Sequence, residues 1–365
     1  MRRQWVAPYL ACSVLVAGGC DVLFPYTRAA DSRRPDVVGW PDVRRGDVRA
    51  WDARRDGPRP PDTARADGEL KLDAAPHDAP KVDATKPDGP GCVQPKAVDS
   101  CDQATGWCTI LAGCFQMGSP PTELCRDAND ETQHQVTLTH SFVISRTHVT
   151  QSAFLARMSY NPSSNFGCTD CPVEQVNWHE AAAYCNALSA FHSLGPCYGC
   201  SGSGTGVSCA VLTAYQGSSI YTCPGYRLPT DAEYEYATRA GSTTALYNGP
   251  LGECGGKADA NAEAIAWYKY NGGPKPHPVG LRDKNGWGLR DMSGNIWEWV
   301  HDGYVADLGS VPDVDPARPF TGTLGVLRGG SYFDDARHLR SAARYEGLVA
   351  LKVGTNGLRC VRTLP

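Results

Sequence analysis

The sequence has no excess of basic residues. Its 365 residues carry a net charge of −4, and charged residues make up only 20% of the chain. A protein that holds a nucleic acid backbone needs a broad cationic surface, which this balance of charges does not supply. We therefore expect no nucleic-acid partner.

The sequence also lacks an apolar run near its start that is long enough to span a bilayer. After a basic start, the run from Val6 to Val16 is short, as in a signal peptide. It ends in VAGGC at 16–20, which resembles a lipobox, although Ala17 stands where Leu is usual. We expect a signal peptide at 1–19, lipidation of Cys20, and an exported protein held on the membrane by this anchor, on the periplasmic or cell-surface side. The alternatives are cleavage without lipidation and an uncleaved anchor.

Aliphatic residues are scarce from residue 21 to residue 91, where Asp, Pro, Arg and Ala recur in a loose repeat. Such a segment cannot bury enough apolar surface to offset the entropy of ordering its backbone. We expect residues 20–91 to form a disordered tether that holds a globular part away from the membrane. A specific wall-binding tail is the alternative.

Cysteine, in contrast, is abundant. Setting aside Cys12 in the signal and Cys20 at the lipid site leaves fourteen of the sixteen cysteines, an even number that suits an oxidising compartment. The pairs CTDC and CYGC have the two-residue gap of zinc knuckles. In an oxidising compartment we expect disulfides instead, among Cys168, Cys171, Cys197, Cys200, Cys209 and Cys223. We also expect the segment 191–225 to be a surface loop pinned by such bonds.

Regular secondary structure is sparse in the remaining chain. Strands are predicted at 135–139, where apolar and polar residues alternate, and at 142–145. Two helices are predicted from capping boxes, Asn177 with Glu180 and Thr230 with Glu233. The first helix presents an apolar face made of Ala181, Tyr184, Cys185 and Leu188. These elements favour a large, loop-rich α+β domain over 92–365.

Six sequence blocks follow one another in a specific order. They are GCFQMGS at 113–119, PVEQVNW at 172–178, RLPTDAEYEYATRAG at 227–241, GWGLRDMSGNIWEW at 286–299, RGGSYF at 328–333 and GLRC at 357–360. This order resembles the formylglycine-generating enzyme, or sulfatase-modifying factor, domain from end to end. The resemblance implies a modified C-type-lectin-like α+β fold with little regular secondary structure.

The resemblance also implies a structural calcium ion. Its ligands would be Asp291 through its side chain or carbonyl, the carbonyls of Gly294 and Ile296, and the carboxylate of Glu298. The alternative is a capped turn that packs on Trp297 and Trp299 without an ion. A second family site would fall near Asn261 and Asn271, where the surrounding sequence departs from the family pattern.

The main departure from the family lies at the reactive centre. Family oxidases carry two cysteines there, which bind copper and activate oxygen. Here Asp334 stands at the first position, and a shortened loop before Ser341 removes the second. A hard carboxylate cannot replace a soft thiolate pair as a ligand of Cu(I). We therefore expect no copper and no formylglycine-generating oxidase activity, while activity of another kind stays open.

Two structural disulfides are known in the family. One would join the positions of Thr238 and Ser341 in this chain, so both of its cysteines are absent together. The other has both partners present, and the resemblance implies a bond between Cys185 and Cys360.

The function we expect is that of a non-oxidase binding or scaffolding lipoprotein. The family groove would be lined by Trp297, Ser331, Tyr332 and Asp334, and would take an unknown peptide or glycan, because one fold hosts unrelated functions. The alternative is an enzyme of different chemistry or a maturation factor of the same superfamily. Iron-dependent sulfoxide synthases of the superfamily need a histidine triad, and the tether has only His77.

Charged residues surround the vacated centre. His338 lies near Asp334 in the sequence, with Arg328 and Arg344 on either side. The two arginines are expected either to belong to the site or to pair with buried carboxylates of the fold, a role for which Arg is the usual choice.

Overall fold

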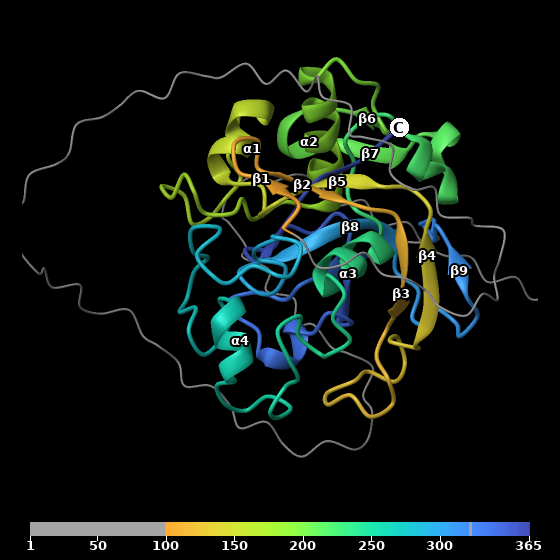
Figure 1. The fold of residues 1–365 in the computed structure, drawn as a ribbon. Helices are drawn as coiled ribbons and strands as arrows, with labels where there is room; N and C mark the ends of the chain where they lie inside the picture. The colour runs from red at the N-terminus through yellow and green to blue at the C-terminus, as the bar shows by residue number, and fades with distance from the viewer. Residues whose placement is uncertain (1–98, 321–322) are drawn as a thin grey trace, which may run out of the picture. The chain divides into compact units, whose positions relative to one another are not determined.

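The computed structural model describes residues 99–320 and 323–365 (Figure 1). The predicted signal peptide, Cys20 and the tether lie outside the described residues. Within them, short strands and helices alternate with long loops, as expected for a loop-rich α+β domain. No helix in this part of the chain is long and apolar enough to cross a membrane.

The first sheet joins the beginning of the described chain to its end. Its order is β1-β2-β5-β13, and every pairing in it is antiparallel. The strands are β1 (Cys101–Asp102), β2 (Trp107–Ile110), β5 (Phe142–Ser145) and β13 (Val361–Thr363). Ile144 of β5 faces Cys108 on one side and Val361 on the other, and all three are buried.

The second sheet carries the sequence blocks that resemble the family's reactive region. Its order is β11-β10-β8-β12, with β12 parallel to β8 and the other pairs antiparallel. The strands are β8 (Trp297–Gly303), β10 (Leu324–Arg328), β11 (Arg344–Leu348) and β12 (Asn356–Gly357). Every residue of β8 is buried. Among the described strands, β11 pairs only with β10, so it is an edge strand.

The other strands form one three-stranded sheet and one hairpin. The sheet has the order β3-β4-β9, from β3 (Gly113–Met117), β4 (His134–Leu138) and β9 (Asp313–Val314). The hairpin consists of β6 (Tyr198–Ser201) and β7 (Ser208–Val211). The strand predicted at 135–139 is thus present as β4, shifted by one residue, and the strand predicted at 142–145 is present as β5.

Both predicted helices form, and both capping boxes are confirmed. In α2 (Trp178–Phe191), the side chain of Asn177 accepts from the backbone N–H of Glu180 at 2.9 Å, and Glu180 accepts in return from the N–H of Asn177 at 3.2 Å. In α3 (Asp231–Arg239), Thr230 and Glu233 exchange the same two bonds, at 3.1 and 2.8 Å.

Two further helices were not predicted. In α1 (Gln151–Met158) only Gln151 and Phe154 are buried, so the apolar face is too narrow to be recognised in the sequence. The last helix, α4 (Ala260–Ile265), spans only six residues. It packs with Tyr268 and Leu339 in a small second core, which lies against the loop that follows β10.

Disulfides hold the loops of the described chain. They include Cys101–Cys108, Cys125–Cys254, Cys168–Cys171, Cys197–Cys223 and Cys200–Cys209. The last three confirm the prediction of disulfides over zinc. The prediction of a pinned surface loop at 191–225 was too simple, because Tyr198, Ile220 and Tyr221 in this segment are buried in the main core.

Candidate functional site

At the position that the resemblance assigns to the first copper cysteine, the chain has an anchored carboxylate. Asp334 lies in the turn after β10, and its Oδ2 accepts hydrogen bonds from the backbone N–H of Ser331 at 3.0 Å and from its hydroxyl at 2.5 Å. The indole N–H of Trp297, at the start of β8, donates to the same oxygen at 2.8 Å. One carboxylate oxygen therefore closes the turn through Ser331 and joins it to the sheet through Trp297.

Two glycines allow this turn to approach its neighbours closely. Gly329 and Gly330 have φ angles of 93° and 76°, which favour glycine. A Cβ on Gly329 would lie 2.6 Å from the hydroxyl oxygen of Tyr234, and one on Gly330 would lie 2.8 Å from the carbonyl oxygen of His338. The backbone geometry therefore requires the two glycines of the RGGS block, and this requirement does not depend on which side chain is at position 334.

His338 lies beside the anchored carboxylate but does not form a catalytic relay. Its Nδ1 is 3.8 Å from Oδ1 of Asp334, and its ring contacts that of Trp297 edge-on, with centroids 6.0 Å apart. Burial lowers the pKa of His338, so its ring is neutral near pH 7. The Ser331 hydroxyl donates to Asp334 and not to the imidazole. A serine nucleophile needs a base at its own hydroxyl, so this arrangement provides no activated serine.

Four aromatic side chains lie in the turn or near it, and we call them the aromatic surface: Phe333 and Tyr345 are exposed, His338 is partly exposed, and Trp297 is buried with its ring against those of His338 and Tyr345. The rings of Trp297 and Tyr345 lie 5.4 Å apart, and the side chains of Phe333 and Tyr345 are 66% and 42% exposed. The structure thus brings together the predicted groove residues Trp297, Ser331 and Asp334. Trp297, Ser331 and Tyr332 are all buried, so Asp334 is the one of the four predicted groove residues that is partly exposed. Sequence reasoning missed Phe333, although it ends the RGGSYF block, and Tyr345, which no motif marks.

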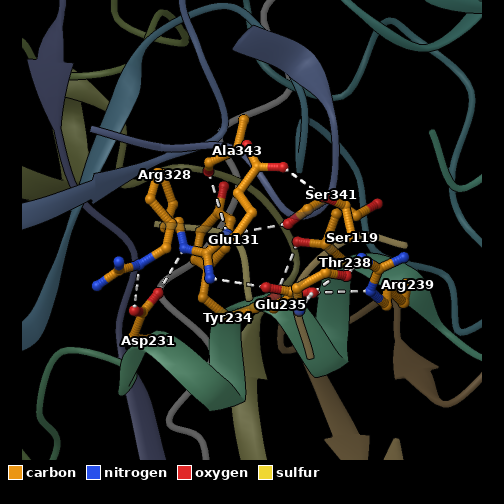
Figure 2. A network of polar contacts seen from close by, with 12 residues as sticks. Ser119, Glu131, Asp231, Tyr234, Glu235, Thr238, Arg239, Arg328, Ser341 and Ala343 are labelled. Carbon is orange, nitrogen blue, oxygen red and sulfur yellow. Dashed lines mark hydrogen bonds and ion pairs between the residues drawn. The ribbon is translucent and has the colours of Figure 1, made fainter. Parts of the chain in front are cut away.

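Behind the turn lies a buried network of ion pairs (Figure 2). Arg328 donates from Nη2 to Glu235 of α3 at 2.8 Å, and Arg344 donates from Nε to Asp231 at 2.8 Å. Although burial alone raises it, the pKa of Asp231 is lowered by the charges of Arg328 and Arg344. This geometry confirms that the two arginines are partners of buried carboxylates.

The same network contains Thr238 and Ser341, the two positions to which the resemblance assigns a family disulfide. Thr238 and Ser341 are both buried (Figure 2). The Thr238 hydroxyl donates to the carbonyl of Tyr234 at 2.8 Å, and the carbonyl of Ser341 accepts from Arg328 at 3.0 Å. In this chain, polar contacts therefore hold both positions.

The cysteines of the other family disulfide are close together in the core. Cys185 of α2 and Cys360, which precedes β13, are both buried, and their sulfur atoms lie 2.7 Å apart. The structure leaves both as thiols, so the bond between them stays a prediction.

The turn predicted to bind calcium has the expected tight backbone. Asp291, Gly294 and Asn295 have φ angles of 55°, 77° and 66°. A Cβ on Gly294 would lie 2.4 Å from the carbonyl oxygen of Trp267, so only glycine fits there.

The oxygens of this turn, however, already have partners. Glu298 accepts from Arg359 at 2.7 Å and from the hydroxyl of Tyr234 at 2.9 Å, and the Ile296 carbonyl oxygen lies 3.2 Å from Nε2 of His148. As they are arranged, these residues do not fit a calcium ion.

The side chains of the second predicted calcium site also contact protein backbone. The Asn261 amide donates to the carbonyl of Pro250 at 2.8 Å. Asn271 donates to the carbonyl of Ala266 at 3.0 Å and accepts from the N–H of Tyr268 at 2.9 Å. Both residues shape loops near α4, and an ion at this place stays a prediction.

A loop-rich α+β domain with this order of blocks and this glycine-dependent turn is of the formylglycine-generating-enzyme type. The family model described as the sulfatase-modifying factor enzyme 1-like domain matches residues 93–364. The chain belongs to this family.

Relatives of the chain include a protein named as a chaperone and formylglycine-generating enzymes. Chaperone protein LppX of Paenibacillus barcinonensis is 34% identical over 185 residues, which cover 43% of this chain and 61% of LppX. The formylglycine-generating enzyme of Streptomyces coelicolor is 37% identical over 145 residues, which cover 37% of this chain and 46% of the enzyme. The chain thus spans less than two thirds of the length of either relative.

Solved structures share the fold. Treponema denticola variable protein 1 superposes with a TM-score of 0.58 at 29% identity, covering 70% of this chain and 94% of that protein. PvdO from Pseudomonas aeruginosa superposes with a TM-score of 0.56 at 23% identity, covering 76% of this chain and all of PvdO.

Proposed function

We propose that this protein is an exported, lipid-anchored binding protein of chaperone type, which holds extended polypeptide segments on its aromatic surface and is not a formylglycine-generating oxidase. The observation that carries the proposal is the anchored carboxylate of Asp334 at the position of the first copper thiolate. Its Oδ2 accepts from Ser331 and Trp297, so this residue holds the turn and offers no soft ligand.

The remaining thiols do not supply a copper site near this turn. Among the described residues, the cysteines without a disulfide are Cys185 and Cys360, and both are buried in the core between α2 and β13. A copper oxidase of this family needs two thiolates at the reactive centre, and the loop after Asp334 provides none.

A polypeptide ligand is favoured by the strand that borders the aromatic surface. Tyr345 belongs to β11, the edge strand of its sheet. An extended segment can add to such an edge through main-chain hydrogen bonds, and exposed aromatic rings beside the edge can contact its side chains. The likeness to a relative named as a chaperone supports a polypeptide over a glycan.

The proposal is tested with the full-length chain in detergent and fluorescein-labelled unstructured peptides, with binding measured by anisotropy. Two peptides are N-methylated at alternate residues, one at the odd and one at the even positions. In one of them the methyl groups remove the main-chain N–H donors that would face β11, and in the other these donors are kept. We expect one of the two methylated peptides to bind weakly and the other to bind like the unmodified peptide, because strand addition uses every second N–H. Equal binding of both would contradict strand addition.

A pair of variants tests the aromatic surface. Replacing Phe333 and Tyr345 together by Ser is expected to weaken peptide binding by roughly tenfold or more, since exposed aromatics often dominate such contacts. Phe166→Ser is the matched control, because Phe166 is 81% exposed and lies outside the aromatic surface. Binding of oligosaccharides without peptides would contradict the polypeptide ligand. Conversion of the Cys of a sulfatase-type peptide to formylglycine, seen by mass spectrometry, would contradict the loss of oxidase activity.

The membrane anchor is tested separately at Cys20. We expect the chain to be labelled by a palmitate analogue, and Cys20→Ala to release it into the soluble fraction. Wild-type protein that is unlabelled and soluble would show that Cys20 carries no lipid.

A further inference from the structure

The side chain of His148 lies among the oxygens that the family resemblance assigns to calcium. It follows β5 and is buried with a relative exposure of 2%. Its Nε2 is 3.2 Å from the carbonyl oxygen of Ile296 and 3.3 Å from Oε1 of Glu298. One imidazole nitrogen thus faces two of the four expected ligands.

The tautomer of His148 fits this position. Its Nδ1 is buried and has no hydrogen-bond partner among the described residues, so the ring proton belongs on Nε2, where two acceptors are available. The N–H can be shared between the Ile296 carbonyl and the Glu298 carboxylate.

A second donor, Arg359, reaches the turn from the other side. This guanidinium is completely buried and donates from Nε to Oε2 of Glu298 at 2.7 Å. Its Nη2 donates to the carbonyl of Asp291, another of the expected ligands, at 3.0 Å, and to the carbonyl of Arg290 at 3.2 Å. Between them, His148 and Arg359 contact oxygens of Ile296, Glu298 and Asp291.

The charge of Glu298 is already compensated. A buried carboxylate is costly unless it is paired and hydrogen-bonded, and Glu298 is both, through Arg359 and through the hydroxyl of Tyr234. A divalent cation at Glu298 would be repelled by the guanidinium and would have to displace the imidazole from its two acceptors.

We propose that the imidazole of His148, beside the guanidinium of Arg359, takes the place of the calcium ion at this turn, so that the chain folds there without a metal. Like an ion, the two side chains gather oxygens of the turn and join them to distant segments. His148 brings the segment after β5, and Arg359 brings the segment before β13 and also donates to the carbonyl of Ser145 at 3.2 Å. Three parts of the chain are thereby fixed together by protein groups alone.

The first test uses the wild-type full-length chain. Its melting temperature is measured in excess calcium and in chelator, and we expect the two values to agree, because nothing at the turn exchanges with the solution. A melting temperature that rises with calcium, with the rise abolished in Glu298→Gln, would overturn the proposal.

The second test restores an oxygen ligand. His148→Asp removes the imidazole and adds a short carboxylate beside Glu298. We expect this variant to have a lower melting temperature than the wild type in chelator, and calcium to raise that temperature through mass action. His192→Asp is the matched control at the end of α2, far along the chain from the turn. We expect its melting temperature to be the same in calcium and in chelator.

These two variants separate the outcomes. A folded His148→Asp protein that ignores calcium would show that the imidazole does not stand where an ion binds, and would overturn the proposal. If His148→Asp does not fold in either condition, the wild-type comparison alone decides it. The outcome is independent of peptide binding, which the aromatic-surface variants measure.

Discussion

At the level of single residues, the most informative position is Asp334, and the sequence already marks it. The block RGGSYF locates the turn, and the absence of cysteine after it predicts the loss of the copper site. Only the structure shows that the substituted carboxylate has a structural use, because the groups that donate hydrogen bonds to it come from β8 and from the turn itself. The role of His148 was not foreseen either, since no motif connects it to residues almost 150 positions away.

Restoring one cysteine at the centre should not restore the chemistry. For Asp334→Cys we expect neither tight Cu(I) binding nor formylglycine formation, because a single thiolate remains where two are needed. The turn also loses a hydrogen-bonded acceptor, which should lower the free energy of unfolding by roughly 1–3 kcal/mol. Competition with a Cu(I) chelator, peptide mass spectrometry and urea unfolding measure the three effects. Asp335→Cys is the neighbouring control, and oxidation of the peptide by Asp334→Cys would contradict the expectation.

At the level of helices and strands, the elements predicted correctly were those marked by local sequence signals. The helices α2 and α3 were predicted because each begins with a capping box, which is a short-range pattern. Strand β8 was not predicted, because it is buried on both faces and shows no alternation, and its pairing with β10 and β12 depends on residues far along the chain. The short helix α4 depends on the second core in the same way.

The link between α3 and β10 gives a test of the buried network. Arg328→Met leaves Asp231 paired with Arg344 alone and Glu235 paired with Arg239 alone, and we expect it to lower the free energy of unfolding by roughly 3–5 kcal/mol. The matched variant Arg337→Met breaks an exposed pair with Asp335 and should cost roughly 0–1 kcal/mol. Urea denaturation of both proteins measures the difference. Similar losses in the two variants would show that the buried network does not hold α3 to the sheet.

At the level of the whole molecule, a disulfide-rich domain indicates an extracytoplasmic location. The compartment was predictable from the number of cysteines, but most of the pairing was not, because connectivity is set by the folded chain and not by spacing. The bond Cys125–Cys254 is an example. It joins the loop before β4 to the loop before α4, and nothing in the sequence relates these two segments.

A bond between Cys185 and Cys360 would attach the C-terminal segment to helix α2. We expect a disulfide between them, which would close a loop with a sequence separation of 175 residues. In the chain-entropy model such a cross-link stabilises by about 4–5 kcal/mol. Mass spectrometry of a non-reduced digest identifies the bond, and the double variant to Ser should unfold at lower urea concentration. Alkylation of both thiols in unreduced, denatured protein would contradict the prediction.

The nested bonds Cys200–Cys209 and Cys197–Cys223 have a consequence for durability outside the cell. The glycine-rich stretch 201–206 is largely exposed and lies inside both rings. If an extracellular protease cuts the backbone there, the two new ends stay covalently connected, and the buried Tyr198 and Tyr221 on either side keep their places in the core. A nicked molecule would then remain a single particle, and the damage would become visible only as two fragments on a reducing gel.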